Sequence, residues 1–243
     1  MSKRILITGA STGIGAETAV EMAAGNELFL HYNRSESEAR KVSERVEKSG
    51  GRAHLIQADL STESGCITLH NAVNSKTNSL DVLVNNAGGL IRRHTAETLE
   101  WELMLQIFAL NTFSTMKMTS LCIPLLEKGG QPCIINLTSI AMRTGAPSAS
   151  IYGASKGAVD SFTRGMAKEL APKIRVNAVA PGVILTPFHD KVTSAEQLAN
   201  FKQGIPLNTY GESRHIAATI KYLVENAFVT GETIDVNGGH FMR

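Results

Sequence analysis

Short apolar segments alternate with longer segments of helical periodicity along nearly the whole chain. Such alternation predicts a mostly parallel sheet covered by helices on both faces, and right-handed crossovers make the fold doubly wound. The predicted strands are Arg4–Thr8, Leu28–Tyr32, Ala53–Gln57, Val82–Asn85, Cys133–Leu137, Arg175–Ala180 and Thr233–Val236. The predicted helices are Gly13–Ala24, Ser37–Lys48, Glu63–Asn74, Leu99–Leu126, Ser150–Leu170 and Ser213–Val224. We therefore expect an α/β chain with a seven-stranded, mostly parallel sheet.

The 243 residues contain no linker, repeat or low-complexity segment that divides them. We therefore expect a single doubly wound Rossmann domain over residues 1–243. Only residues 183–211 interrupt the alternation, because this stretch carries Pro187 and Pro206 and has weak periodicity. We predict a loop-plus-helix insertion there, over the site.

Composition excludes several classes of partner. The net charge is +2 and the basic residues are scattered, which argues against a nucleic-acid or anionic-membrane surface. No apolar stretch approaches the roughly 18 residues of a spanning helix, and the first residues do not resemble a signal peptide. Cys66, Cys122 and Cys133 are far apart and form no CxxC pair, which favours reduced, packed thiols. We expect a cytoplasmic protein.

A glycine-rich turn lies between the first predicted strand and the first predicted helix. Gly9, Gly13 and Gly15 allow a tight turn that brings backbone N–H groups close to a pyrophosphate at the helix N-terminus. Ser11, Thr12 and Ile14 complete this segment. No Lys follows in a GK[ST] position, so a Walker-type NTPase is disfavoured. Glycines at such a place are alternatively simple turn residues.

A possible acid/base pair lies in the predicted helix Ser150–Leu170. Tyr152 and Lys156 are four residues apart, so their side chains share one helix face. An ammonium near a phenol lowers its pKa from about 10. Ser139, thirteen residues before Tyr152, follows a strand at the carboxyl edge of the sheet, where doubly wound folds bind ligands. The alternatives are a chance surface pair and a turn serine.

Taken together, the motifs resemble those of the short-chain dehydrogenases/reductases over nearly the whole chain. The matching segments, in family order, are Thr8-Gly-Ala-Ser-Thr-Gly-Ile-Gly15, Asp59-Leu60, Asn85-Asn-Ala-Gly88, Asn111, Ser139, Tyr152-Gly-Ala-Ser-Lys156, Pro181-Gly182 with Thr186, and Val236-Asn-Gly-Gly239. One such segment is weak evidence, but the set is close to diagnostic. Gly89, which doubles the usual single glycine, departs from the pattern near the substrate mouth.

The resemblance implies a catalytic role for four residues. Tyr152 is expected to act as the general acid/base, and Lys156 to hold the nicotinamide ribose and lower the Tyr152 pKa. Ser139 is expected to steady the substrate carbonyl or alcohol. Asn111 is expected to hold a water that links Lys156 to solvent; alternatively it is a polar residue that kinks or caps its helix.

The resemblance also implies a cofactor site and no metal. Asp59 and Leu60 are expected at the adenine, and Asn86, Ala87 and Gly88 near the adenosine ribose. The segment of Pro181, Gly182, Val183 and Thr186 is expected at the nicotinamide amide. For the Asn residues after the fourth strand, the alternative is an ordinary strand-end turn.

The end of the second strand indicates NADP(H) rather than NAD(H). NAD enzymes usually place an Asp or Glu there to bind the ribose 2′-hydroxyl. This chain has Asn33, Arg34 and Ser35, of which Arg34 offers a charged contact to a 2′-phosphate. Two residues leave the choice open: Thr12 lies where many NADP-using relatives carry a second basic residue, and Glu36 is an alternative ribose reader.

These features predict an NADP(H)-dependent oxidoreductase acting on a small-molecule carbonyl or secondary alcohol. The subgroup closest in look contains 3-oxoacyl-(acyl carrier protein) reductases, so a carrier-bound acyl substrate is one possibility. A non-catalytic NAD(P)-binding regulator on the same fold is the alternative, but it is expected to lose Tyr152, Lys156 or Ser139, and all three are present. The family commonly forms tetramers through the helices that are here Leu99–Leu126 and Ser150–Leu170. Their surplus apolar residues, Trp101, Phe108, Phe113 and Met116, support a homotetramer.

Overall fold

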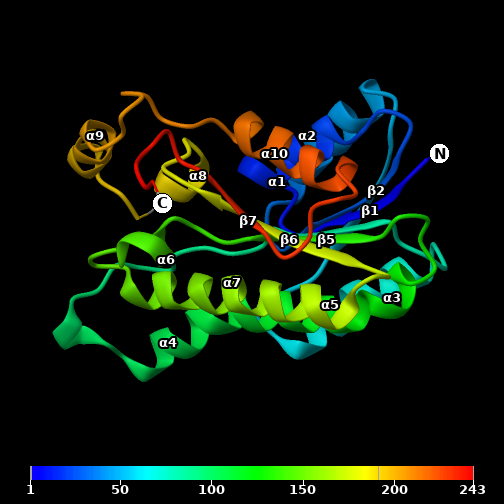
Figure 1. Cartoon of the computed structure of the whole chain (residues 1–243), viewed down its shortest axis with the longest axis horizontal. Helices are drawn as coiled ribbons and strands as arrows, with labels where there is room; N and C mark the ends of the chain where they lie inside the picture. Colours follow the sequence, from blue (N-terminus) through cyan, green and yellow to red (C-terminus); the bar gives the residue numbers. More distant parts are fainter. Residues whose placement is uncertain (1, 191, 243) are drawn as a thin grey trace.

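The computed structural model describes residues 2–190 and 192–242 and contains one seven-stranded sheet (Figure 1). The strands are β1 (Arg4–Ile7), β2 (Glu27–Tyr32), β3 (Arg52–Gln57), β4 (Val82–Asn85), β5 (Cys133–Leu137), β6 (Arg175–Pro181) and β7 (Thr233–Val236). Their order is β3-β2-β1-β4-β5-β6-β7, and every neighbouring pair is parallel. The doubly wound sheet expected from the alternation is confirmed, and the direction in which successive strands are added to the sheet reverses between β1 and β4.

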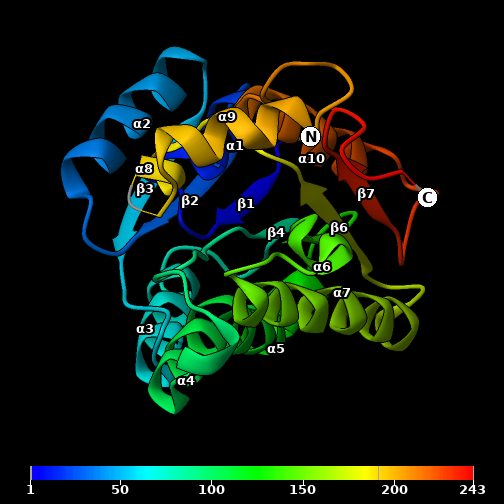
Figure 2. The ribbon, with the colours of Figure 1, turned by 90° about the vertical axis from the view of Figure 1, so that its left-hand side faces the viewer.

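Helices cover both faces of the sheet, as Figures 1 and 2 show. One face carries α1 (Gly13–Glu21), α2 (Glu36–Lys48) and α10 (Ser213–Glu225). The other face carries α3 (Glu63–Asn74), α4 (Trp101–Phe108), α5 (Ser114–Leu126) and α7 (Ser150–Leu170). The short helices α6 (Ala141–Thr144), α8 (Pro187–Asp190) and α9 (Ala195–Gln203) lie at the edge that faces the viewer in Figure 2. No helix among the described residues is long and apolar enough to cross a membrane.

Strand periodicity divides the core into two layers. Successive side chains of a strand point to opposite faces, so Ile5 and Ile7 pack with α1 and α10 while Leu6 packs with α3 and α5. The same division holds in β4, where Val82 and Val84 join the first layer and Leu83 the second. Because both faces are covered, the strands are continuous apolar runs rather than alternating ones.

Local sequence features account for two helix ends, and the expectation of packed free thiols is confirmed. Thr62 caps α3, since its hydroxyl accepts the Gly65 N–H at 3.0 Å. Gly50 follows α2 with a left-handed φ of 81°. All three cysteines are free and buried, and burial raises the pKa of the Cys66, Cys122 and Cys133 thiols to about 11, 12 and 11.

Two helix predictions are wrong in their bounds. The first helix ends at Glu21 rather than Ala24, because a turn back into β2 begins there. The segment Leu99–Leu126 is not one regular helix: it starts at Trp101 and changes to a π-helical turn, η2 (Ala109–Phe113), before α5. A π-turn contains an extra residue in the helix, a feature often found at functional sites. It contains Asn111, whose side chain bonds to Gly89 outside the helix and to the Ile107 carbonyl within it.

The interruption at 183–211 contains α8 and α9, joined back to the body by a bridge between Ile184 and Gly211. Ser194 caps α9, with its hydroxyl accepting the Gln197 N–H at 3.1 Å. The segment lies at the carboxyl edge of the sheet, where Thr186, Phe188 and His189 line the same cleft as the turn after β1.

Candidate functional site

A cleft of about 1260 Å³ opens at the carboxyl ends of the strands. Its lining includes residues that follow all seven strands, from the glycine-rich turn after β1 to His240 after β7. The predicted site residues that line it are Gly9, Ser11, Thr12, Gly13, Ile14, Asn33, Arg34, Ser35, Asp59, Leu60, Asn86, Ala87, Gly88, Ser139, Tyr152, Lys156, Pro181, Gly182, Val183 and Thr186. Gly15 and Asn111 do not line it. The fold thus gathers residues from most of the chain at the point where strand order reverses.

Buried polar groups fix the glycine-rich turn. Gly9 has a left-handed φ of 64°. Its N–H donates to His31 Nδ1 at 2.9 Å, and its carbonyl accepts from Asn86 Nδ2 at 2.9 Å. A Cβ on Gly15 would lie 2.3 Å from the Gly9 carbonyl oxygen, so glycine is required where α1 meets the turn. These contacts join β1, β2 and β4 into one rigid cradle.

The N-terminus of α1 is open toward the cleft. Thr12 is the N-cap in an extended conformation, and its side chain makes no capping bond. The first turn has no acidic residue, so the free N–H groups and the positive end of the helix dipole stay available to an anion. Thr186 lies opposite, with its methyl carbon 3.2 Å from where a Gly13 Cβ would be. This arrangement suits a pyrophosphate.

Charged residues after β2 and β3 form the far end of the cleft. Arg34 makes no ion pair within 4 Å among the described residues. The pKa of Asp59 is lowered, first by hydrogen bonds from Ser61 and less by the Arg34 charge. Glu36, the alternative ribose reader, instead accepts from Arg40 Nε at 3.1 Å on the exposed start of α2 and does not line the cleft. The Arg34 guanidinium therefore faces the cleft without an ion-pair partner among the described residues, whereas the Glu36 carboxylate is paired with Arg40.

Ser139, Tyr152 and Lys156 meet beside this cradle. Tyr152 lies on the first turn of α7, and Lys156, on the next turn, is buried with its Nζ 5.9 Å from the Tyr152 ring centroid. Lys156 Nζ donates to the Leu137 carbonyl at 2.8 Å. Ser139 Oγ accepts the Ala141 N–H at 3.1 Å and hydrogen-bonds with the Tyr152 hydroxyl. Loop and helix thus bring a hydroxyl, a phenol and an ammonium together, as predicted.

The electrostatics at Tyr152 differ from the prediction. Burial raises the pKa of Tyr152 to about 12, and the hydrogen bond with Ser139 lowers it only partly. The Lys156 ammonium, engaged with Leu137, is not among the causes that lower it. Burial also lowers the pKa of Lys156 to about 8. The expected depression of the Tyr152 pKa by Lys156 is therefore absent here, because desolvation of both groups outweighs their interaction.

Asn111 is buried and joins two segments. Its Oδ1 accepts the Gly89 N–H at 2.9 Å, while Nδ2 donates to the carbonyls of Gly89 and Ile107, both at 2.9 Å. Both amide hydrogens are thus used within the protein. The π-turn places this side chain to hold the segment after β4, and a Cβ on Gly88 would meet Asn111 Oδ1 at 2.6 Å.

Four further residues of the cleft were missed by sequence reasoning. His31 is 3 % exposed on β2 and accepts the Gly9 N–H, so its proton sits on Nε2, which donates to the Ala58 carbonyl at 3.1 Å. Arg93, His189 and His240 line the opposite end. A histidine within the apolar run 28–32 was the one available sequence signal. Among the described residues, no group of three or more His, Cys, Asp or Glu is arranged to hold a metal ion.

Comparisons with known proteins agree with this geometry. The model of a family described as "Enoyl-(Acyl carrier protein) reductase" matches residues 9–240. A 3-oxoacyl-[acyl-carrier-protein] reductase of Synechocystis sp. is 37% identical over 246 residues, covering 98% of this chain and 96% of the relative.

Solved structures are similarly close. An NADH-dependent reductase, A1-R′, responsible for alginate metabolism superposes with a TM-score of 0.91 at 30% identity, covering 100% of this chain and 98% of that one. The RhlG/NADP active-site complex of Pseudomonas aeruginosa gives a TM-score of 0.91 at 29% identity, with 98% and 96% covered. The whole chain, including the segment 183–211, thus has counterparts in reductases of known structure.

Proposed function

This chain belongs to the short-chain dehydrogenase/reductase family of oxidoreductases, and we propose that it is an NADP(H)-dependent member that interconverts a carbonyl and a secondary alcohol. The observation that carries the proposal is the meeting of Ser139, Tyr152 and Lys156 in the same cleft as the glycine-rich cradle. A non-catalytic dinucleotide-binding regulator has no need for a phenol, a hydroxyl and a buried ammonium at one place.

The cradle fits a dinucleotide. The uncapped N-terminus of α1 binds the pyrophosphate, and the close packing at Gly15 lets the backbone approach it. Asp59 and Leu60 bind at the adenine, and the backbone of Asn86, Ala87 and Gly88 borders the ribose. Lys156 has two N–H donors left beyond its bond to Leu137, and these bind the second ribose. When bound, the nicotinamide supplies or accepts the hydride.

The chain's own residues handle the proton. Ser139 donates a hydrogen bond to the substrate oxygen and holds the carbonyl carbon in position. Tyr152, neutral at working pH because burial raises its pKa, donates its hydroxyl proton to that oxygen during reduction. Lys156, with a pKa of about 8, is mostly protonated near pH 7 and keeps a positive charge 5.9 Å from the centre of the Tyr152 ring. Asn111 keeps the Gly88–Gly89 backbone in place beside Lys156.

Arg34 supports the choice of NADP(H). Its guanidinium lines the cleft without a carboxylate partner within ion-pair distance, which suits a 2′-phosphate. Glu36 is held by Arg40 outside the cleft and does not compete. One similar structure contains NADP and another is described as NADH-dependent, so family membership alone does not decide the cofactor.

A substrate panel tests the proposal. Purified protein is incubated with NADPH or NADH and free ketones, ketoacids and a 3-oxoacyl thioester, and the absorbance of the reduced nicotinamide is followed. The thioester is included because one relative acts on carrier-bound 3-oxoacyl groups. We expect oxidation of NADPH by at least one carbonyl compound, faster than of NADH. Tight NADPH binding with no turnover across the panel would favour the regulator instead.

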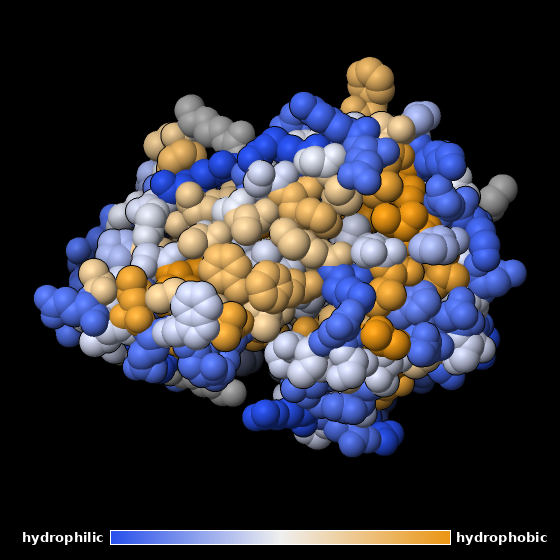
Figure 3. Space-filling view, turned by 90° about the horizontal axis from the view of Figure 1, so that it is seen from below, coloured by the Kyte–Doolittle hydropathy of each residue, from blue (hydrophilic) through white to orange (hydrophobic). Residues whose placement is uncertain are grey.

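Assembly into a homotetramer is the second part of the proposal. Figure 3 looks onto α4, α5 and α7 and shows hydrophobic atoms across the middle of this face. Trp101 and Phe113 are 73% and 53% exposed on it, whereas Phe108 packs inward. Such exposed apolar surface is typical of an interface.

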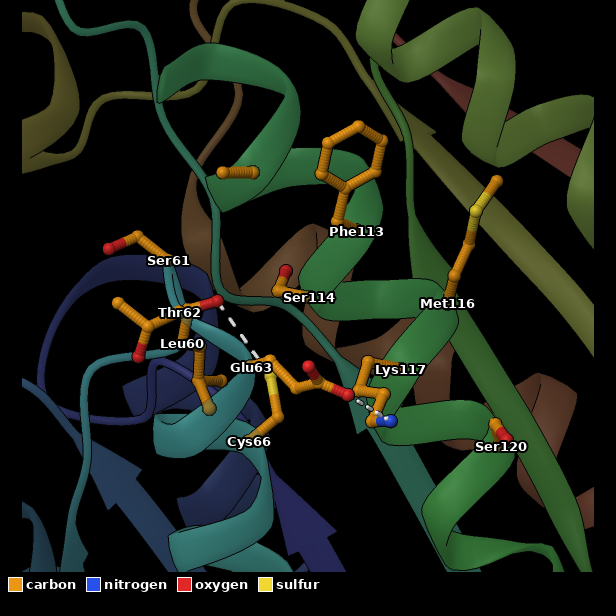
Figure 4. A pocket seen from close by; sticks show the side chains of 11 residues that line it. Leu60, Ser61, Thr62, Glu63, Cys66, Phe113, Ser114, Met116, Lys117 and Ser120 are labelled. Carbon is orange, nitrogen blue, oxygen red and sulfur yellow. Dashed lines mark hydrogen bonds and ion pairs between the residues drawn. The ribbon is translucent and has the colours of Figure 1, made fainter. Parts of the chain in front are cut away.

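A smaller cavity adjoins this face. It measures about 440 Å³ and lies between the start of α3 and the helix that carries Phe113 and Met116 (Figure 4). The Glu63–Lys117 ion pair, 2.7 Å long, lies at its side. An apolar side chain of a second copy fits this hollow. Light scattering at micromolar concentration is expected to give about four times the 26.1 kDa chain mass, and a monomeric mass would contradict the assembly.

A cytoplasmic location completes the proposal. Its support is the three free, buried thiols, whose raised pKa values keep them protonated and unreactive. Fractionation of cells that express the protein tests it.

A further inference from the structure

The substrate end of the cleft contains a cation that the reaction itself does not use. Arg93 follows β4 and lines the same continuous cavity as Tyr152. Its Nε donates to the Val192 carbonyl at 2.5 Å, Nη1 to Ser148 Oγ at 3.1 Å and Nη2 to Thr193 Oγ1 at 3.1 Å. A guanidinium has five N–H donors, so one hydrogen on each terminal nitrogen has no partner among residues 2–190 and 192–242.

No carboxylate of the described residues forms an ion pair with Arg93. Among the residues that the structure describes, none of the acidic side chains comes within ion-pair distance of Arg93, whereas its neighbour Arg92 pairs with Glu100 at 2.5 Å. The ring of Phe201 covers one side of the guanidinium, with Cζ 5.9 Å from the ring centroid. Burial lowers the pKa of Arg93, and the Arg93 charge is the second cause, after burial, that lowers the pKa of His189. Partial desolvation without a counter-charge makes this an attractive place for an anion.

A short row of side chains connects Arg93 with the acid/base. Tyr152 and Phe188 have ring centroids 6.0 Å apart, and Phe188 and His189 5.1 Å. His189 Nδ1 is 3.0 Å from Thr193 Oγ1, the same oxygen that Arg93 contacts. Ser148, the other Arg93 partner, precedes Tyr152 by only four residues. Tyr152 and Arg93 thus line one cavity and are linked along its wall by the rings of Phe188 and His189.

We propose that the substrate is a small carbonyl or hydroxy compound carrying an oxyanion group, a carboxylate or a phosphate, which the two unused N–H groups of Arg93 bind. The inference rests on the proposed oxidoreductase function and narrows its substrate class. A planar guanidinium matches either oxyanion with two parallel hydrogen bonds. The reacting carbon then lies at Ser139 and Tyr152, while the anion is held beneath α9.

Matched substrate pairs test the proposal. Acetoacetate is compared with methyl acetoacetate, and dihydroxyacetone phosphate with dihydroxyacetone, in the presence of NADPH and NADH. We expect the charged member of at least one pair to have a kcat/KM higher on the order of tenfold to a hundredfold, as charge-assisted hydrogen bonds provide. Which pair shows the preference identifies carboxylate or phosphate.

Substitutions separate anion binding from support of the segment 183–211, because Arg93 also bonds to Val192 and Thr193 of that segment. Arg93→Gln is expected to remove the preference through a higher KM for the charged member only, while Arg92→Gln, the matched control, retains it. Equal losses for charged and neutral members, or no preference in the unaltered protein, would overturn the assignment.

If no compound of either pair is turned over, the failure does not by itself decide about Arg93. Titration calorimetry with sodium malonate on the protein saturated with NADP then decides. Binding that Arg93→Gln abolishes and Arg92→Gln keeps supports the anion site. Absent binding, or binding unchanged in Arg93→Gln, refutes it.

Discussion

The two ends of the cleft are held together in different ways. At the cofactor end, backbone groups of the glycine-rich turn are bound by buried side chains of neighbouring strands, His31 and Asn86, at 2.9 Å. At the substrate end, the segment 183–211 is exposed at Leu185 and Leu207, by 50% and 71%. It is tied to the body by the side chain of Arg93 and by the Leu207 N–H, which donates to the Gly238 carbonyl at 3.1 Å.

This difference suggests which properties of the cleft the family shares and which belong to this chain. A dinucleotide is bound by backbone N–H groups, a helix terminus and close packing, and these contacts tolerate little change of backbone conformation. A substrate is read by side chains on a loop-rich segment that a rigid scaffold supports. We therefore expect the cofactor end to reflect the family and the substrate end to determine which substrate this chain takes.

Removing the Tyr152 hydroxyl gives the largest expected effect and sharpens the contrast between chemistry and cofactor binding. Tyr152→Phe is expected to lower kcat about 10²–10⁴-fold, because the proton donor is lost. The dissociation constant of NADPH, measured by fluorescence, is expected to stay the same, since the cradle does not depend on the phenol. Tyr222→Phe, on the exposed side of α10, is the matched control. Near-normal turnover of Tyr152→Phe would show that another group donates the proton.

The rigidity of the cofactor end is tested at Gly15. An alanine Cβ would lie 2.3 Å from the Gly9 carbonyl oxygen and 2.6 Å from Asn86 Nδ2, and the backbone atom has little room to move. Gly15→Ala is expected to lower the free energy of unfolding by about 3 kcal/mol, at the upper end of overpacking costs, and to weaken NADPH binding. Chemical denaturation measures the first effect.

Gly165 provides the control for that substitution. It lies in α7 with nothing within 4 Å of an added Cβ. Gly165→Ala is expected to leave stability unchanged or raise it by up to about 1 kcal/mol, because alanine favours the helix. Equal responses of the two glycines would mean that the cradle is more compliant than the packing indicates.

Cofactor choice is tested at Arg34. Arg34→Ala is expected to weaken NADPH binding on the order of tenfold to a hundredfold, the size of a charged hydrogen bond, and to leave NADH binding nearly unaffected. Arg45→Ala, which removes an ion pair with Glu17 outside the cleft, is the matched control. If the unaltered protein prefers NADH, or Arg34→Ala keeps its NADPH affinity, the NADP(H) assignment is wrong while the oxidoreductase assignment survives.

The smallest predicted effect is a pH dependence of the free energy of unfolding, which arises at His31. Burial is the main cause of its lowered pKa, so the folded protein keeps His31 neutral and the unfolded chain, with a pKa near 6.5, takes up the proton first. Unfolding free energy is therefore lost as pH falls below about 6.5 and is unaffected above it. Each unit of depression corresponds to about 1.4 kcal/mol.

Thermal melts between pH 5 and 7.5 measure this contribution. His31→Gln is expected to reduce the slope of melting temperature against pH, because the group that takes up a proton on unfolding is absent. His70→Gln, on α3, serves as the control. A slope identical to that of the unaltered protein would show that His31 is not the residue responsible.

The sequence was most informative where a structure depends on neighbouring residues. β4, β5 and β7 have the predicted bounds, and Thr62 caps α3, because strand periodicity and capping act over a few residues. Most residues of the cleft were expected from the family resemblance, and they meet because, in a parallel sheet, whatever follows a strand lies at the same edge.

Only the tertiary structure decided what those residues contact. The bonds of Asn111 to Gly89, of His31 to Gly9 and of Arg93 to Thr193 join segments 22, 22 and 100 residues apart. The same holds for the raised Tyr152 pKa, which depends on how much of the chain covers the phenol. Local patterns determine which elements form and in what order, whereas burial and unpaired charge arise only when distant segments pack together, and those two quantities govern the chemistry of this cleft.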